Sequence, residues 1–304
     1  MSDSAAMDVS LDAGPEIVAI PGPTVMPERV LAAMRHPMPD IYAGELTEVI
    51  DEVWSALPGI ARTASRAYVA IGNGHAGWEM ALTNTLCRGD RVLVLECGRF
   101  ATVWGELASF NGLDVDVLYA ERGRAVDPAA VAERLAADVN RDIKAVLTVQ
   151  SDTASSVRND IPAIRRVLDD ADHPALLMVD CIASMACEPY FMDEWGVDVT
   201  VAASQKGLMT PPGLGFVWAG PRALAAHERA DLRTRYWDWT YRVEDGPYYL
   251  RFCGTPPVSH LFALREALRM IDEEGIEARW ERHRILGAAV RAAVGAWSDD
   301  AGLG

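Results

Sequence analysis

The chain has 304 residues, of which 50% are hydrophobic and 24% are charged, and its mean hydropathy is +0.03. This length corresponds to one large domain or two smaller ones, and it buries enough apolar surface to fold without a disulfide or a structural metal. The 28 basic and 44 acidic side chains give a net charge of −16, and so negative a surface repels the phosphates of nucleic acids and anionic lipids. The composition therefore excludes a disordered chain and argues against nucleic-acid and membrane partners.

Short apolar runs alternate with amphipathic stretches from residue 66 onward. The runs expected to form strands are Arg66–Ile71, Arg91–Leu95, Leu113–Tyr119, Lys144–Val149, Ala175–Asp180, Val197–Ala202 and Gly215–Ala219. The stretches expected to form helices are Gly74–Leu86, Phe100–Phe110, one that starts at Asp127 and Pro128, Ile161–Leu168, Val258–Glu274 and Ile276–Trp297. Continuous apolar strands separated by helices predict an α/β fold with a largely parallel sheet covered on both faces. Ligands of such sheets bind at the carboxyl ends of the strands.

Two strand ends carry residues with more than one interpretation. Gly72 to Ala76 (GNGHA) joins a strand to a helix, where glycines and free N–H groups could hold a phosphate, although a tight turn also needs glycines. Asp180 ends an apolar strand, where it could be a structural cap or the acceptor for a protonated ring nitrogen.

The next two junctions carry a lysine and a group of hydroxyls. Lys206 lies between a buried strand and a Pro-Pro-Gly turn, in a segment with almost no other charge. Desolvation makes a lysine amine more nucleophilic, so this context favours a Schiff-base lysine over a surface lysine. The hydroxyl-rich loop 150–156 (QSDTASS) could supply caps or ligand donors.

These junctions, taken in order, resemble the class V aminotransferase family of fold-type I pyridoxal-phosphate enzymes, which includes alanine–glyoxylate, serine–glyoxylate and pyridoxamine–pyruvate aminotransferases. The resemblance runs from Pro21 to about Trp297. It is carried by the segments IPGPTVMPERVL, GNGHAGWEMAL, LLMVDCIASMACEP, DVTVAASQKGLMTPPGLGF and GTPPVSHLFALREAL. It implies a mostly parallel seven-stranded sheet, a pyridoxal 5'-phosphate cofactor and a homodimer.

Carried over to matching positions, the resemblance assigns the chemistry to two residues. Lys206 would bind the cofactor as a Schiff base and later move the α-proton of the substrate, and Asp180 would keep the pyridine nitrogen protonated. Phe100 falls where the family places an aromatic ring against the cofactor, with Trp104 as the alternative. Thr153 falls where a hydroxyl meets the cofactor ring.

The resemblance also implies a phosphate site. Asn73, Gly74 and His75 would face the phosphate, and Gln205 would assist. Thr255 matches a phosphate ligand that the family donates from the neighbouring subunit.

The same resemblance gives a domain organisation. It implies an N-terminal extension over 1–20, a cofactor-binding large domain over 21–255, and interdomain helices with the start of a small domain over 256–304. Nothing after Trp297 matches the family's arginine segment that binds the substrate carboxylate, so we expect a truncated small domain.

The expected activity is transfer of an amino group from a small donor, such as alanine or serine, to a 2-oxo acid such as glyoxylate or pyruvate. A lyase or desulfurase-like enzyme of the same family and a catalytically impaired cofactor-binding relic remain alternatives. The context of Cys253 argues against a desulfurase. The odd number of cysteines, none at metal-ligand spacing, and an N-terminus without signal-peptide character predict a reducing, cytoplasmic location without a bound metal.

Overall fold

The computed structural model describes residues 18–242 and 248–300, so most of the expected extension 1–20 and the last four residues lie outside the described part. The strands are β1 Arg66–Gly72, β2 Arg91–Glu96, β3 Asp114–Tyr119, β4 Ile143–Val149, β5 Leu176–Asp180, β6 Val199–Ala203 and β7 Gly213–Ala219. The helices are α1 Glu28–Met34, α2 Glu45–Ala61, α3 Gly74–Thr85, α4 Arg99–Phe110, α5 Pro128–Ala137, α6 Ile161–Asp170, α7 Pro221–His227, α8 Val258–Glu274 and α9 Ile276–Asp300. Short 3-10 helices cover Trp239–Tyr241 and Tyr248–Phe252.

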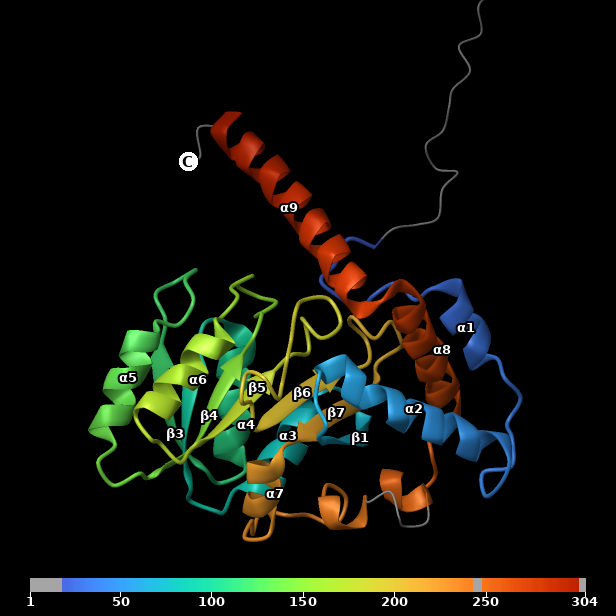
Figure 1. The fold of residues 1–304 in the computed structure, drawn as a ribbon, viewed down its shortest axis with the longest axis horizontal. Coiled ribbons are helices and arrows are strands. Elements are labelled where there is room, and N and C mark those ends of the chain that lie inside the picture. Colours follow the sequence, from blue (N-terminus) through green and yellow to red (C-terminus); the bar gives the residue numbers. More distant parts are fainter. Residues whose placement is uncertain (1–17, 243–247, 301–304) are drawn as a thin grey trace, which may run out of the picture.

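The seven strands form one sheet in the order β1-β7-β6-β5-β4-β2-β3. The pairs between β2 and β3, β2 and β4, β4 and β5, and β5 and β6 are parallel, whereas β7 pairs antiparallel with both β1 and β6. The prediction of a mostly parallel seven-stranded sheet flanked by helices is therefore confirmed (Figure 1).

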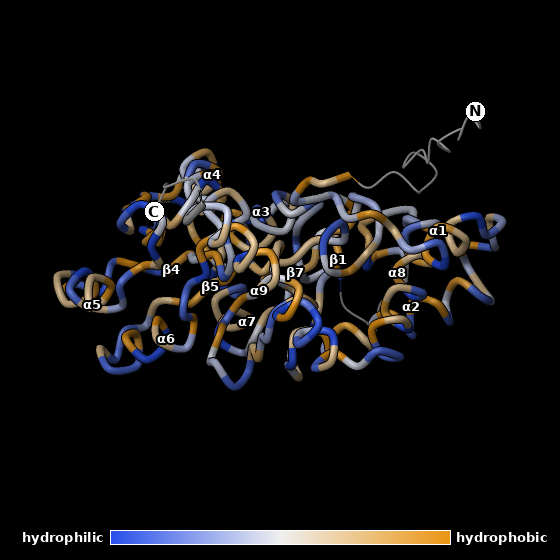
Figure 2. Tube along the Cα trace, turned by 90° about the horizontal axis from the view of Figure 1, so that it is seen from above, coloured by the Kyte–Doolittle hydropathy of each residue, from blue (hydrophilic) through white to orange (hydrophobic). Residues whose placement is uncertain are grey.

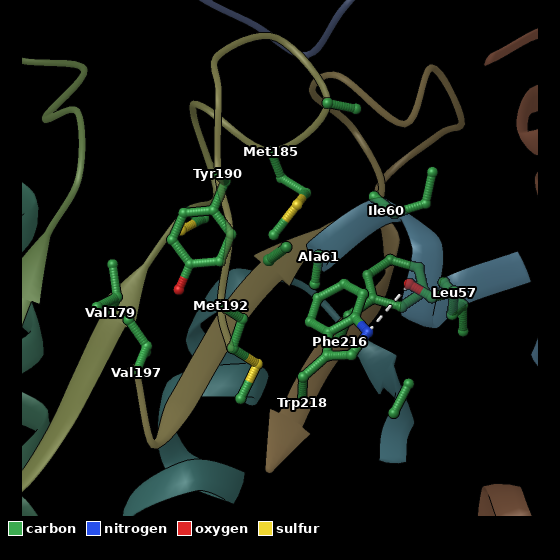
Figure 3. Close-up of a cluster of buried hydrophobic side chains, with 14 of the residues drawn as sticks. Leu57, Ile60, Ala61, Val179, Met185, Tyr190, Met192, Val197, Phe216 and Trp218 are labelled. Atoms are coloured by element: carbon green, nitrogen blue, oxygen red, sulfur yellow. Dashed lines mark hydrogen bonds between the residues drawn. The ribbon is translucent and has the colours of Figure 1, made fainter. Parts of the chain in front are cut away.

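Alternate side chains of each strand point to opposite faces and build two separate cores. On β2, Leu93 and Leu95 join the core under α2, α5, α6 and α8, while Val92 and Val94 join the core under α3 and α4. Figure 2 shows hydrophobic and hydrophilic residues alternating along the outer helices. Figure 3 shows part of the first core, where the Trp218 indole N–H donates to the Leu57 carbonyl of α2 at 3.2 Å.

Local sequence signals explain several helix boundaries. The side chain of Asp127 accepts a hydrogen bond from the Ala129 N–H at 2.9 Å, and Pro128 occupies the first turn of α5, as predicted. Three helices, α1, α2 and α7, were not among the predicted elements. Their positions matter, because α2 covers one face of the sheet and α1 packs on α8 through Val30, Ala263 and Ala267.

The last helix leaves the body of the molecule. Its first turns are buried at Trp280, but Val290 and Trp297 are 64% and 68% exposed, and its far end projects away from the sheet (Figure 1). In the described residues, no helix is long and apolar enough to cross a membrane.

Close packing of α3 on the sheet depends on Gly77, where an added Cβ would lie 2.7 Å from Val201 Cγ1. We predict that Gly77→Ala lowers the free energy of unfolding by about 1–3 kcal/mol, because the methyl group forces α3 away from β6. Gly59→Ala in α2 is the matched control, since nothing lies within 4 Å of its added Cβ. It should raise the free energy by up to about 1 kcal/mol through helix propensity. Urea unfolding measures the free energy of unfolding of both variants. If Gly77→Ala and Gly59→Ala changed it equally, the packing argument would be wrong.

Candidate active site

A cavity of about 210 Å³ lies at the carboxyl ends of the parallel strands. Eight residues predicted from the sequence line it together, namely Asn73, Gly74, His75, Phe100, Thr153, Asp180, Gln205 and Lys206. They come from the last residue of β5 and from the segments that directly follow β1, β2, β4 and β6, including the first turns of α3 and α4. Because these loops all leave the same edge of the sheet, the fold brings together residues up to 133 positions apart in the chain.

The first turn of α3 forms one wall of the cavity. Asn73 is the N-cap residue, and its side-chain oxygen accepts a hydrogen bond from the His75 N–H at 3.0 Å. The remaining N–H groups of a helix start have no partners within the helix, and the helix dipole places positive charge there. This wall suits an anion such as a phosphate.

Asp180 lines the cavity and is only 3% exposed. One carboxylate oxygen, Oδ1, accepts from the Ile182 N–H at 2.6 Å, and the other, Oδ2, accepts from the Trp78 indole N–H at 3.1 Å. Burial raises the pKa of Asp180 to about 7, although both hydrogen bonds and the Lys206 charge act in the opposite direction. A cationic group placed in the cavity would favour the ionised carboxylate.

Lys206 lies in the loop between β6 and β7, close enough to Asp180 for their charges to interact. Its Nζ donates to the Pro21 carbonyl at 2.9 Å, and a Cβ on Gly22 would lie 2.5 Å from that nitrogen. Glycine at position 22 therefore leaves room for the amine. Desolvation lowers the pKa of Lys206 more than the Asp180 carboxylate raises it, and a lowered pKa makes a lysine amine more available as a nucleophile.

The other predicted residues differ in their surroundings. Phe100 and Thr153 are partly buried at the cavity wall. Gln205 Oε1 is buried and has no hydrogen-bond partner within the described part of the chain. Trp104, the alternative to Phe100, does not line this cavity and is fully buried, with its ring stacked on Trp78. Thr255 is exposed and lies outside the lining of this cavity.

The sequence reasoning missed three residues that organise the site. Asp152 is buried and its carboxylate accepts from the Phe100 and Ala154 N–H groups, both at 2.8 Å, which fixes two cavity loops relative to each other. Trp78 holds Asp180, as described above. Trp78 could have been found from the sequence, because it lies one helical turn after the glycine loop that was expected to bind phosphate. Nothing in the sequence near Asp152 indicated its partners.

The third missed residue, Arg279 on α9, is 4% exposed. Its guanidinium donates to the Ala186 carbonyl through Nε and to the Gly207 carbonyl through Nη2, each at 2.8 Å. The first carbonyl belongs to the loop that follows Asp180 and the second to the loop that carries Lys206. Arg279 therefore ties both loops to the start of α9.

The residues present fit pyridoxal 5'-phosphate, the cofactor that the resemblance implies. An amine that can bind its aldehyde, a buried carboxylate for its ring nitrogen and a helix N-terminus for its phosphate all face one cavity. The buried amide oxygen of Gln205, which has no hydrogen-bond partner among the described residues, offers a further acceptor at the same cavity. Among residues 18–242 and 248–300, no group of three or more histidine, cysteine or acidic side chains could hold a metal ion.

Comparison with known proteins gives consistent matches over most of the chain. The family model described as "Aminotransferase class-V" matches residues 61–298. The chain is 42% identical over 286 residues to serine–glyoxylate aminotransferase of Methylorubrum extorquens, covering 91% of this chain and 70% of that protein. It is 37% identical over 286 residues to L-aspartate–glyoxylate aminotransferase of Paracoccus denitrificans, covering 92% and 71%.

A solved structure agrees with these sequence matches. The crystal structure of pyridoxamine–pyruvate aminotransferase from Mesorhizobium loti has a TM-score of 0.82 and 26% identity to this chain, covering 94% of this chain and 73% of that one. Both the sequence and the arrangement of the sheet and its cavity therefore lead to one conclusion: the chain belongs to the class V aminotransferase family of pyridoxal-phosphate enzymes.

Proposed function

We propose that the protein transfers an amino group from a small amino donor, such as alanine or serine, to a 2-oxo acid such as glyoxylate or pyruvate. The observation that carries this proposal is the convergence of the Lys206 amine, the buried Asp180 carboxylate and the first turn of α3 on one cavity. The similarity to aminotransferases whose names specify glyoxylate or pyruvate supports the choice of acceptor.

The two charged residues perform the central chemistry in this proposal. Bound pyridoxal phosphate supplies an aldehyde that exchanges between amines and a ring that withdraws electrons from the substrate α-carbon. Lys206 Nζ would hold the aldehyde of the cofactor, and its amine would move protons between the substrate α-carbon and the neighbouring position. Asp180, which is only 3% exposed, would hold a proton on the ring nitrogen by supplying the opposite charge.

The remaining residues bind and orient the cofactor. Asn73, Gly74 and His75, which line the cavity at the positive end of α3, would hold the phosphate, and Gln205 would add a polar contact. Phe100 and Thr153 would contact the ring. These contacts keep the reacting atoms in place while Lys206 moves the proton.

The assembly and location extend the proposal. Thr255 is exposed, so it is free to reach the cofactor phosphate of a second subunit in a homodimer. We assign 21–255 to the cofactor-binding large domain and 256–304 to interdomain helices and the start of a small domain. All five cysteines are free thiols, which supports a reducing compartment such as the cytoplasm.

The first test uses the chain's two lysines, Lys144 and Lys206. Borohydride reduction of the yellow holoenzyme should fix the cofactor on Lys206, as located by peptide mass spectrometry. Lys206→Ala should abolish both the yellow colour and amino transfer, while Lys144→Ala, which alters an exposed residue, should keep both. An adduct on Lys144 would overturn the assignment.

The second prediction concerns the pH dependence of stability without cofactor. The pKa of Asp180 is about 7 in the folded protein, against an ordinary value of 3.8. The protonated side chain therefore contributes fully to the free energy of unfolding below pH 3.8, and this contribution is lost as the pH rises through 7. Between pH 5 and pH 8 this loss should be on the order of 2 kcal/mol. Asp180→Asn cannot ionise and should gain that amount relative to the wild type in urea unfolding. Asp172→Asn, at an exposed carboxylate, is the control. Parallel pH profiles for Asp180→Asn and the wild type would contradict the prediction.

The third prediction concerns the shared site. If Thr255 binds the phosphate of the opposite subunit, diluting the protein should release cofactor and separate the subunits together, since ligand binding and association are linked. Sedimentation recorded at protein and cofactor wavelengths measures both. Thr255→Val should weaken the dimer only when cofactor is present. A monomer with stoichiometric cofactor would refute the shared site.

A further inference from the structure

Trp78 contacts Asp180, but the proposed function gives Trp78 no role. Trp78 lies on α3 and is fully buried, and its indole N–H donates to Asp180 Oδ2 at 3.1 Å. The backbone N–H of Ile182 holds the other oxygen, Oδ1. Each carboxylate oxygen therefore has one donor from the protein.

The position of the indole is fixed by its neighbours. Its ring stacks on Trp104 with centroids 5.8 Å apart and an interplanar angle of 12°. His75 packs on it with centroids 4.5 Å apart. Since α3 is in turn held against β6 at Gly77, the N–H reaches Asp180 from a rigid support. Because the indole N–H is held rigidly, it determines the orientation of the Asp180 carboxylate.

Both contacts favour one protonation state of Asp180. An indole N–H and a backbone N–H can only donate, so each requires an acceptor lone pair on its oxygen. A carboxylate offers such lone pairs on both oxygens, whereas a carboxylic acid presents a hydroxyl on one of them. The other charged groups that act on Asp180 are Lys206, from the loop after β6, and Asp152, from the loop after β4; His75 contacts the indole ring.

We propose that Trp78 is a positioning residue for Asp180: its indole N–H fixes the carboxylate in one orientation and favours its charged form, and thereby sets how tightly a protonated pyridine nitrogen is held. This inference rests on the proposed role of Asp180 and assigns a further residue to that site. It also gives the two stacked tryptophans different tasks. Trp104 Nε1 is buried but has no hydrogen-bond partner among the described residues, so that ring contributes packing alone.

The experiment compares Trp78→Phe with Trp104→Phe. Both variants shorten a buried ring in the same stack, but only the first removes a hydrogen bond to Asp180. The probe is pyridoxamine 5'-phosphate, which binds without a covalent bond to Lys206, and its dissociation constant is measured by calorimetry from about pH 6 to about pH 9.

Losing one donor to a charged group should raise the pH midpoint of probe binding by roughly one to two units in Trp78→Phe. Binding should then be roughly tenfold weaker near pH 7 and should approach the wild-type value toward about pH 9. Trp104→Phe should keep the wild-type midpoint. The phenyl ring of Trp78→Phe is smaller than the indole and could also disturb packing. A benzothienyl analogue of tryptophan at position 78 keeps the size and shape of the indole but has no N–H. It should show the same midpoint as Trp78→Phe.

The outcomes separate this inference from the proposed function. Asp180→Asn should remove the part of the pH dependence that Asp180 contributes and leave only that of the probe's own phosphate and ring nitrogen; if its profile matched the wild type, the role of Asp180 itself would be wrong. If Asp180→Asn behaves as expected but Trp78→Phe keeps the wild-type midpoint, or weakens binding equally at every pH, Trp78 is only a packing residue and the inference fails.

Discussion

The site depends on keeping a carboxylate charged where water cannot reach it. Burying Asp180 at the end of β5 costs free energy, and the protein offsets part of this cost with two donors and a nearby amine. Each compensating group comes from a different segment: Ile182 from the loop after β5, Trp78 from α3 and Lys206 from the loop after β6. The same carboxylate therefore makes the position of α3, the β5 loop and the Lys206 loop interdependent.

This arrangement explains why the cavity suits a cationic ring. The donors leave Asp180 with a pKa of about 7, so the site alone does not complete the stabilisation of its charge. A protonated pyridine nitrogen supplies the missing positive charge, so binding the cofactor offsets the free energy lost when folding buries the Asp180 carboxylate. Burial of Asp180 therefore destabilises the cofactor-free protein but increases its affinity for the cofactor.

Much of the fold and of the cavity could be predicted because their signals are local. Apolar runs gave the seven strands, and the residues that follow strands in a parallel sheet necessarily meet at one edge. The missed helix α2 had a readable pattern, since Val49, Ile50, Val53 and Leu57 recur at helical spacing on its buried face. The antiparallel direction of β7 had no such signal, because an apolar run does not encode the direction of its strand. The contacts of Trp78 and Asp152 join distant segments, which periodicity alone cannot reveal.

Assembly of the site consequently requires both ends of the described chain. At the N-terminal end, the Thr24 N–H donates to the Gln205 carbonyl at 2.9 Å, and the Pro21 carbonyl accepts from Lys206. At the C-terminal end, Arg279 donates to the carbonyl of Gly207, the residue directly after that lysine. The Lys206 loop is therefore held from two sides by segments about 250 residues apart in sequence. Both contacts join segments far apart in sequence, so the entropy lost in closing these long loops has to be offset before the reactive amine is held in its place.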